Sequence, residues 1–165
     1  MVPTFRALTN SDLPMIYQWI QRPHVAEWWH EPTSYAELER HYIIERSSTR
    51  AYIAMLEGEP IGFIQSYVAM DSGDGWWEEE RDPGVRGIDQ FLANAEQLGR
   101  GVGTGMVSAF VAQLFQDPAV TKVQTDPSPT NERAIRCYRR AGFVVEREVT
   151  TPDGPALLMC LRRAR

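Results

Sequence analysis

The sequence predicts an α/β fold in which a mixed central sheet is flanked by helices, arranged as a single domain over residues 1–165. Two observations predict this class. Segments with the two-residue periodicity of strands alternate with segments of helical periodicity, and turns rich in glycine and proline separate them. The composition, 43 % hydrophobic and 24 % charged, is that of an ordinary globular domain, and no internal repeat, low-complexity segment or linker divides the chain.

The N-terminal third is expected to contain one strand and two helices. Residues 2–8 alternate as in a strand, and apolar residues at helical spacing over 11–20 predict a helix that Pro23 ends. A short segment at 24–29 leads to a second helix, for which Ser34 is a suitable N-terminal cap.

The middle of the chain is expected to be sheet. Residues 51–56 and 61–70 both have strand character, and the turn Glu57-Gly58-Glu59-Pro60 between them predicts an antiparallel hairpin. A further strand over 85–92 follows the glycine-containing loop at 73–75.

The C-terminal half begins with a glycine-rich turn and a helix that has one apolar face, after which residues 122–125 predict a strand. A helix over 131–141, with Gly142 as its C-terminal cap, precedes a final hairpin formed by 143–149 and 156–161. The resulting order, β-α-α-β-β-β-α-β-α-β-β, is that of a mixed α/β sheet.

Charge and composition narrow the classes of partner. The formal charge of −5, from 17 basic and 22 acidic residues, argues against a nucleic acid and suits a cationic partner. No secretory leader and no apolar run of membrane-spanning length is recognised, so we expect a cytoplasmic protein without a membrane partner. A chain of this length folds without a disulfide, so we expect Cys137 and Cys160 to be small buried residues in a reducing compartment. They are not spaced with histidines as zinc ligands, so we expect no metal. We also expect a monomer.

The charges are unevenly distributed along the chain. Seven acidic residues occur within 71–89, whereas the stretch 133–140 carries four arginines and no acid. A run such as Glu78 to Glu80 is equally well explained as a solvated acidic loop. The pattern nevertheless separates an acidic region from a basic one.

The segment Gly99-Arg100-Gly101-Val102-Gly103-Thr104 lies where a strand passes into an amphipathic helix. Backbone N–H groups and the positive end of the helix dipole converge at such a point, and glycines let a phosphate approach the backbone closely. Thr104 adds a hydroxyl. The turn lacks the lysine of a Walker motif and the context of a dinucleotide fingerprint. Taken alone, it is also compatible with a simple tight connection.

A second motif follows in the segment Asn131-Glu132-Arg133-Ala134-Ile135-Arg136-Cys137-Tyr138-Arg139-Arg140-Ala141-Gly142-Phe143. The two motifs, in this order and spacing, resemble the coenzyme A site of GNAT N-acetyltransferases. The resemblance implies the GNAT acyltransferase fold, with splayed strands in the mixed central sheet, and acetyl-CoA as cofactor. It implies these coenzyme-binding residues: Leu92, Ala93, Leu98, Gly99, Arg100, Gly101, Val102, Gly103, Thr104, Asn131, Ala134 and Tyr138.

Leu98 departs from the superfamily pattern, because this position usually holds arginine or glutamine and Gln97 is displaced by one residue. Pyrophosphate contact at this point would therefore rely on backbone groups.

Further segments resemble one family within the superfamily, the aminoglycoside 6'-N-acetyltransferases, over nearly the whole chain. They include Glu27-Trp28-Trp29, Gln65-Ser66-Tyr67, Asp74-Gly75-Trp76-Trp77, Gly87-Ile88-Asp89-Gln90, Thr125-Asp126-Pro127 and Pro152-Asp153-Gly154. The resemblance implies that acids and flat aromatic faces bind a polycationic substrate. The implied substrate-binding residues are Trp29, Gln65, Tyr67, Asp74, Trp77, Asp89, Asp126 and Asp153. Trp28 and Trp76 are equally compatible with the core or a lid.

The resemblance also implies two catalytic residues. Asp89 occupies the position associated with the base, although a carboxylate that only binds the ammonium group, or relays its proton through water, fits its ordinary pKa better. Tyr138 would donate a hydrogen bond to the departing thiolate, with core packing as the alternative. Backbone N–H groups near Leu92 and Ala93 would polarise the thioester carbonyl.

The predicted function is transfer of the acetyl group of acetyl-CoA to the 6'-amine of aminoglycoside antibiotics, which confers resistance. One alternative is a GNAT enzyme that acetylates a protein or polyamine amine, which leaves the acidic and tryptophan segments unexplained. The other is a module that binds coenzyme A or an aminoglycoside without catalysis, against which Asp89 and Tyr138 both argue.

Overall fold

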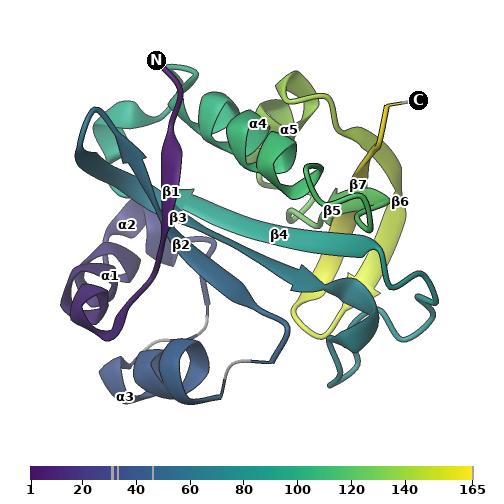
Figure 1. Cartoon of the computed structure of the whole chain (residues 1–165), viewed down its shortest axis with the longest axis horizontal. Helices are drawn as coiled ribbons and strands as arrows, with labels where there is room; N and C mark the ends of the chain where they lie inside the picture. The colour runs from purple at the N-terminus through teal and green to yellow at the C-terminus, as the bar shows by residue number, and fades with distance from the viewer. Residues whose placement is uncertain (31, 33, 46, 165) are drawn as a thin grey trace.

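The computed structural model describes residues 1–30, 32, 34–45 and 47–164. Its strands form one seven-stranded sheet in the order β1-β2-β3-β4-β5-β7-β6 (Figure 1), and every pair is antiparallel except the parallel pair β4/β5. The strands are β1 (Thr4–Ala7), β2 (Arg50–Leu56), β3 (Glu59–Val68), β4 (Val85–Leu92), β5 (Lys122–Thr125), β6 (Val144–Thr151) and β7 (Gly154–Arg162). The predicted mixed sheet is confirmed.

Helices cover both faces of this sheet. They are α1 (Leu13–Ile20), α2 (Pro23–Ala26), α3 (Tyr35–Glu39), α4 (Val102–Leu114) and α5 (Glu132–Arg140). Short turns of other helix types are η1 (Asn10–Asp12), η2 (Arg40–Ile44), η3 (Ala69–Asp71) and η4 (Ala95–Gln97). None of the helices in the described part of the chain has the length and apolarity needed to cross a membrane.

The predicted elements differ from the observed ones mainly at their ends. Pro23 does more than end the first helix, because it occupies the first turn of α2, a position where proline suits a helix. Residue 70 belongs to the turn η3 and not to the preceding strand. The Ser34 cap is confirmed, since its Oγ accepts a hydrogen bond from the Glu37 N–H at 3.2 Å.

Two hydrophobic clusters lie on opposite faces of the central strands. Phe63 of β3 and Phe91 of β4 pack with α1 to α3, whereas Ile64 and Ile88 pack with α4 and α5. Because side chains alternate along a strand, Gln65 and Asp89 share the face of the two phenylalanines. Polar groups are thus placed beside an apolar core.

The parallel pair β4/β5 separates after three residue pairs. Pairing runs from Val85 to Gly87, whereas β4 continues to Leu92. The N–H of Ala93 donates to Ile61 O at 2.9 Å, so the alternation of an antiparallel ladder turns the backbone groups of Leu92 away from β3. The predicted splay is confirmed, and it leaves backbone donors of β4 facing the gap.

Candidate active site

A cavity of about 790 Å³ lies at this splay, and most of the predicted site residues line it. Its lining includes Trp29, Gln65, Tyr67, Asp74, Trp77, Asp89, Leu92, Leu98, Gly99, Gly101, Gly103, Thr104, Asp126, Asn131, Ala134, Tyr138 and Asp153. Trp28 and Trp76 line it as well. Three predicted coenzyme-binding residues, Ala93, Arg100 and Val102, are not part of this lining.

The start of α4 provides an anion-binding end. Gly101 caps the helix with φ of 80° and Gly99 has φ of 72°, backbone conformations that favour glycine. The N–H of Gly105 makes the bond to Gly101 O at 3.0 Å, so the N–H groups of the preceding first turn lack intrahelical acceptors. These donors and the helix dipole attract a phosphate.

Three arginines add positive charge to the cavity. Arg133, Arg136 and Arg140 line it from α5, at spacings of three and four residues that place side chains on one side of a helix. Their individual positions were missed at the sequence level. The signal was nevertheless present in the arginine-rich stretch of that helix.

Asn131 and Thr104 make local bonds at this end. Asn131 Oδ1 caps α5 by accepting from the Ala134 N–H at 3.2 Å, which explains why an asparagine begins the second motif. Thr104 Oγ1 donates to Cys137 Sγ at 3.8 Å and so links the start of α4 to α5. Cys137 and Cys160 are both free cysteines.

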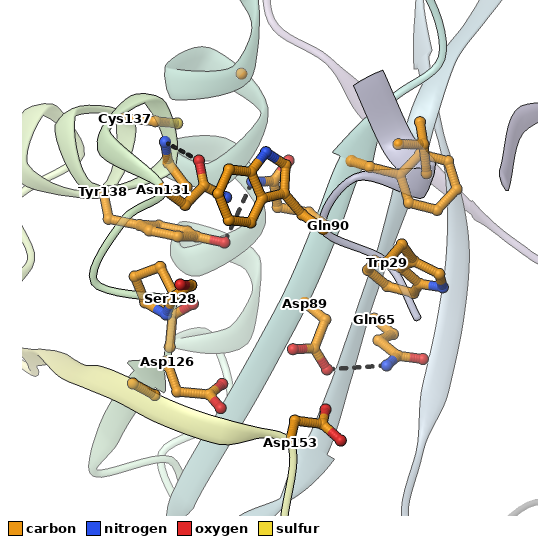
Figure 2. A pocket seen from close by; sticks show the side chains of 18 of the residues that line it. Trp29, Gln65, Asp89, Gln90, Asp126, Ser128, Asn131, Cys137, Tyr138 and Asp153 are labelled. Atoms are coloured by element: carbon orange, nitrogen blue, oxygen red, sulfur yellow. Dashed lines mark hydrogen bonds between the residues drawn. The ribbon is translucent and has the colours of Figure 1, made fainter. Parts of the chain in front are cut away.

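Three carboxylates form an acidic end (Figure 2). Asp89 comes from β4, Asp126 directly follows β5, and Asp153 lies in the turn between β6 and β7. Burial raises the pKa of Asp89, although the hydrogen bond from Gln65 opposes this shift. Burial, followed by the negative charges of Asp89 and Asp153, raises the pKa of Asp126 well above its ordinary value. Such a group of acids favours a bound cation.

Aromatic side chains line the cavity beside these acids. Trp77 Nε1 donates to the Tyr67 hydroxyl at 3.1 Å, and burial raises the pKa of Tyr67 well above its ordinary value. Trp29 packs edge-on against Phe63 and Phe91, with ring centroids 5.5 and 4.9 Å apart. Asp74 lies on an exposed loop with φ of 53°.

Tyr138 reaches the cavity from the buried side of α5 and is 4 % exposed. Burial raises its pKa, so the phenol keeps its proton at neutral pH. Its hydroxyl accepts a hydrogen bond from Gln90 Nε2 at 3.2 Å, and its ring packs against Phe143. The packing alternative is therefore partly right, because the ring belongs to the core while the hydroxyl faces the cavity. Gln90 was missed because its partner is 48 positions away.

The structure corrects one expectation about the splayed strand. The Ala93 N–H is bonded to the Ile61 carbonyl and therefore points toward β3, whereas the prediction required it to point into the gap. The N–H of Leu92 has the required direction. Leu98 and Val102 pack against a small apolar cluster around Met106, and Arg100 is exposed.

Comparison with known proteins agrees with this geometry. Residues 9–151 match the acetyltransferase (GNAT) domain family. The chain is 58 % identical to aminoglycoside N(6')-acetyltransferase type 1 of Klebsiella pneumoniae, over 97 % of this chain and 83 % of that protein.

Two solved structures extend the comparison. A structure of AAC(6')-Ib with paromomycin and acetyl-CoA has a TM-score of 0.95 at 57 % identity, covering 99 % of this chain and 94 % of that chain. A structure of AAC(6')-Ib with coenzyme A and kanamycin has a TM-score of 0.93 at 58 % identity, covering 98 % and 95 %. The chain therefore belongs to the GNAT acetyltransferase family, and within it to the aminoglycoside 6'-N-acetyltransferases.

Proposed function

We propose that this chain transfers the acetyl group of acetyl-CoA to the 6'-amine of aminoglycoside antibiotics and thereby confers resistance to them. One observation carries the proposal: a single cavity joins an anion-binding end to an acidic end at the splay between β4 and β5. An acyl carrier with phosphates and a polyamine need opposite charges of this kind. The relative from Klebsiella pneumoniae, named for this activity, supports the same conclusion.

The basic end fits the coenzyme. Acetyl-CoA supplies an activated acetyl thioester and several phosphate charges. The N–H groups at the start of α4, together with Arg133, Arg136 and Arg140, suit those phosphates. The Leu92 N–H, which points into the gap, is suited to polarise the thioester carbonyl.

The acidic end fits an aminoglycoside, which carries several ammonium groups on hydroxylated rings. Asp74, Asp89, Asp126 and Asp153 would bind ammonium and hydroxyl groups, and all four line the cavity. Trp29 and Trp77 offer aromatic faces for the sugar rings and for cation–π contacts. Gln65 adds an amide group to the cavity lining, and Tyr67 adds a hydroxyl group.

Asp89 and Tyr138 would assist the two proton steps. The substrate ammonium must lose a proton before its nitrogen can attack, and Asp89 would accept it directly or through a water. A raised pKa makes Asp89 a stronger base than an ordinary carboxylate. Tyr138, protonated at neutral pH, would donate a hydrogen bond to the sulfur as the carbon–sulfur bond breaks.

We further propose a cytoplasmic location, which would give the enzyme access to acetyl-CoA, and a monomer as the functional unit.

The proposal is tested by thiol release from acetyl-CoA. We expect rapid release with kanamycin and little release with a peptide amine or with spermine. An aminoglycoside that carries a 6'-hydroxyl in place of the amine should bind through its other ammonium groups but release no thiol. Equal release from the hydroxyl compound would refute the 6'-amine specificity, and preferred release with spermine would favour a polyamine acetyltransferase.

A further inference from the structure

The end of β4 is held by side chains from the segment that joins α1 to α2. His24 Nε2 lies 2.8 Å from Leu92 O, and because a carbonyl only accepts, the imidazole donates. Arg22 Nη1 donates to Ala93 O and to Asn94 Oδ1, each at 2.6 Å. These bonds connect positions 68 to 72 residues apart.

These bonds replace a missing neighbour strand. β5 pairs with β4 only as far as Gly87, so the last carbonyl that faces the gap, that of Leu92, has no strand partner there. A backbone carbonyl removed from water needs a donor. His24 provides this donor and leaves the gap open, whereas a neighbouring strand would close it.

The peptide between Leu92 and Ala93 is consequently held at both of its polar atoms. Its carbonyl accepts from His24, and its N–H donates to Ile61 O at 2.9 Å. Arg22 fixes the next carbonyl along. These bonds oppose rotation of the strand about its axis and so favour the direction of the Leu92 N–H into the gap.

We infer that Arg22 and His24 are positioning residues for acetyl transfer, which hold the end of β4 so that the Leu92 N–H points at the thioester carbonyl. This inference rests on the proposed function. His24 acts through the Leu92 carbonyl at the end of β4, Arg22 acts through the adjoining Ala93 carbonyl, and His24 also lines the cavity. Misplacement of such a donor by a fraction of an ångström reduces its stabilisation of developing charge, while the antibiotic-binding acids stay in place.

The test compares three variants by thiol release with kanamycin. His24→Phe keeps a ring of similar size and removes the donor, so kcat should fall about tenfold or more while the kanamycin KM changes by less than about twofold. His24→Gln retains an N–H at similar reach and should recover most of the loss. Arg86→Met is the matched control, because Arg86 also donates to a carbonyl, that of Pro83 at 2.7 Å, but at the opposite end of β4.

A purely structural role predicts a different result. In that case His24→Phe would lower kcat and raise KM together, or leave both unchanged, and His24→Gln would not restore the rate; each result overturns the inference. If circular dichroism shows that His24→Phe does not fold, Arg22→Met decides by the same criterion. Failure of the proposed function is recognised separately, because the wild-type protein would then release no thiol with kanamycin.

Discussion

Gln65 and Asp89 face each other across the antiparallel pair β3/β4, and Gln65 Nε2 donates to Asp89 Oδ2 at 2.9 Å. The pKa of Asp89 is subject to two opposing effects. Burial disfavours the charged carboxylate and raises the pKa of Asp89, whereas the hydrogen bond favours the charged form. Gln65 therefore helps to keep Asp89 ionised at neutral pH.

Removing the amide donor should make the enzyme more sensitive to acid. In Gln65→Leu the opposing hydrogen bond is lost, so the pKa of Asp89 should rise further. Because the ionised carboxylate is the base, the acid limb of the kcat/KM profile should move to higher pH. Gln113→Leu, an exposed change on α4, is the control. An unshifted acid limb in Gln65→Leu contradicts this role.

Asp89→Asn should separate turnover from stability. The change preserves shape and removes the charge, so turnover should fall about a hundredfold or more. A carboxyl whose pKa is raised by folding binds more protons in the folded state, and its contribution to stability falls as pH rises from its ordinary pKa to the raised one. At pH 7 the neutral variant should therefore unfold at the same temperature as the wild type or higher.

The control for this variant is Asp71→Asn, which neutralises an exposed acid outside the cavity. It should leave turnover unchanged. A normal rate in Asp89→Asn would remove Asp89 from the mechanism, and a lower unfolding temperature at pH 7 would show that its pKa is not raised.

Much of the fold was accessible from local patterns. The strands over 85–92 and 122–125 were predicted with their observed ends, because turn residues mark a boundary of each: Pro83-Gly84 precede the first and Asp126-Pro127 follow the second. The helical turn α2 was not predicted, since Pro23 is compatible with either the end or the start of a helix. A single proline does not distinguish these cases.

The site was predictable where a motif carries it and not where tertiary contacts create it. The glycine turn at 99–104 and the acids of the cavity were recognised from their sequence context. The bonds of Gln90 to Tyr138 and of His24 to Leu92 join distant parts of the chain and have no local signature. Likewise, the Ala93 N–H was misassigned because strand alternation depends on the register with β3.

Gly87 provides the space for an aromatic side chain of the cavity. A Cβ at this position would overlap the ring of Tyr67, whose hydroxyl accepts from Trp77 Nε1. Gly87→Ala should therefore displace both rings, destabilise the fold by about 1–3 kcal/mol and raise the kanamycin KM, with a change in tryptophan fluorescence.

Gly105→Ala is the matched control for this change. A Cβ at Gly105 meets nothing within 4 Å, and the residue lies in α4, so alanine should stabilise the helix slightly. Equal unfolding temperatures and KM values in the two variants would show that Tyr67 adapts without cost.

A side chain at Gly103 should weaken acetyl-CoA binding selectively. A Cβ there would lie 3.5 Å from Cys137 Sγ and 3.7 Å from Leu92 Cδ1, which are ordinary contacts that the fold tolerates. The additional methyl groups of Gly103→Val would instead obstruct the approach of a phosphate to the start of α4. Calorimetry should show weaker acetyl-CoA binding and nearly unchanged kanamycin binding. Unchanged coenzyme affinity in a folded variant would contradict the phosphate assignment.

Kanamycin binding should depend on salt and, unequally, on the four acids of the cavity. Raising the ionic strength screens attraction between exposed charges and leaves buried pairs less affected. Asp74 and Asp153 are exposed, whereas Asp89 and Asp126 are partly buried. Exposed charge pairs contribute on the order of 1 kcal/mol or less, whereas desolvated charged hydrogen bonds contribute up to about 3 kcal/mol. Asn substitutions should therefore weaken kanamycin binding by up to about fivefold at the exposed positions. At the two partly buried positions the loss should be about one to two orders of magnitude, and it should be largest at Asp89. The residual salt dependence should be smaller in Asp74→Asn and Asp153→Asn than in the wild type, since these variants lack the screened charges.

Titrations of the four variants with kanamycin at low and high salt measure both effects, with Asp71→Asn as the reference for a neutralised acid outside the cavity. Equal losses at all four positions would mean that the acids act only through the overall charge of the cavity and do not bind individual ammonium groups.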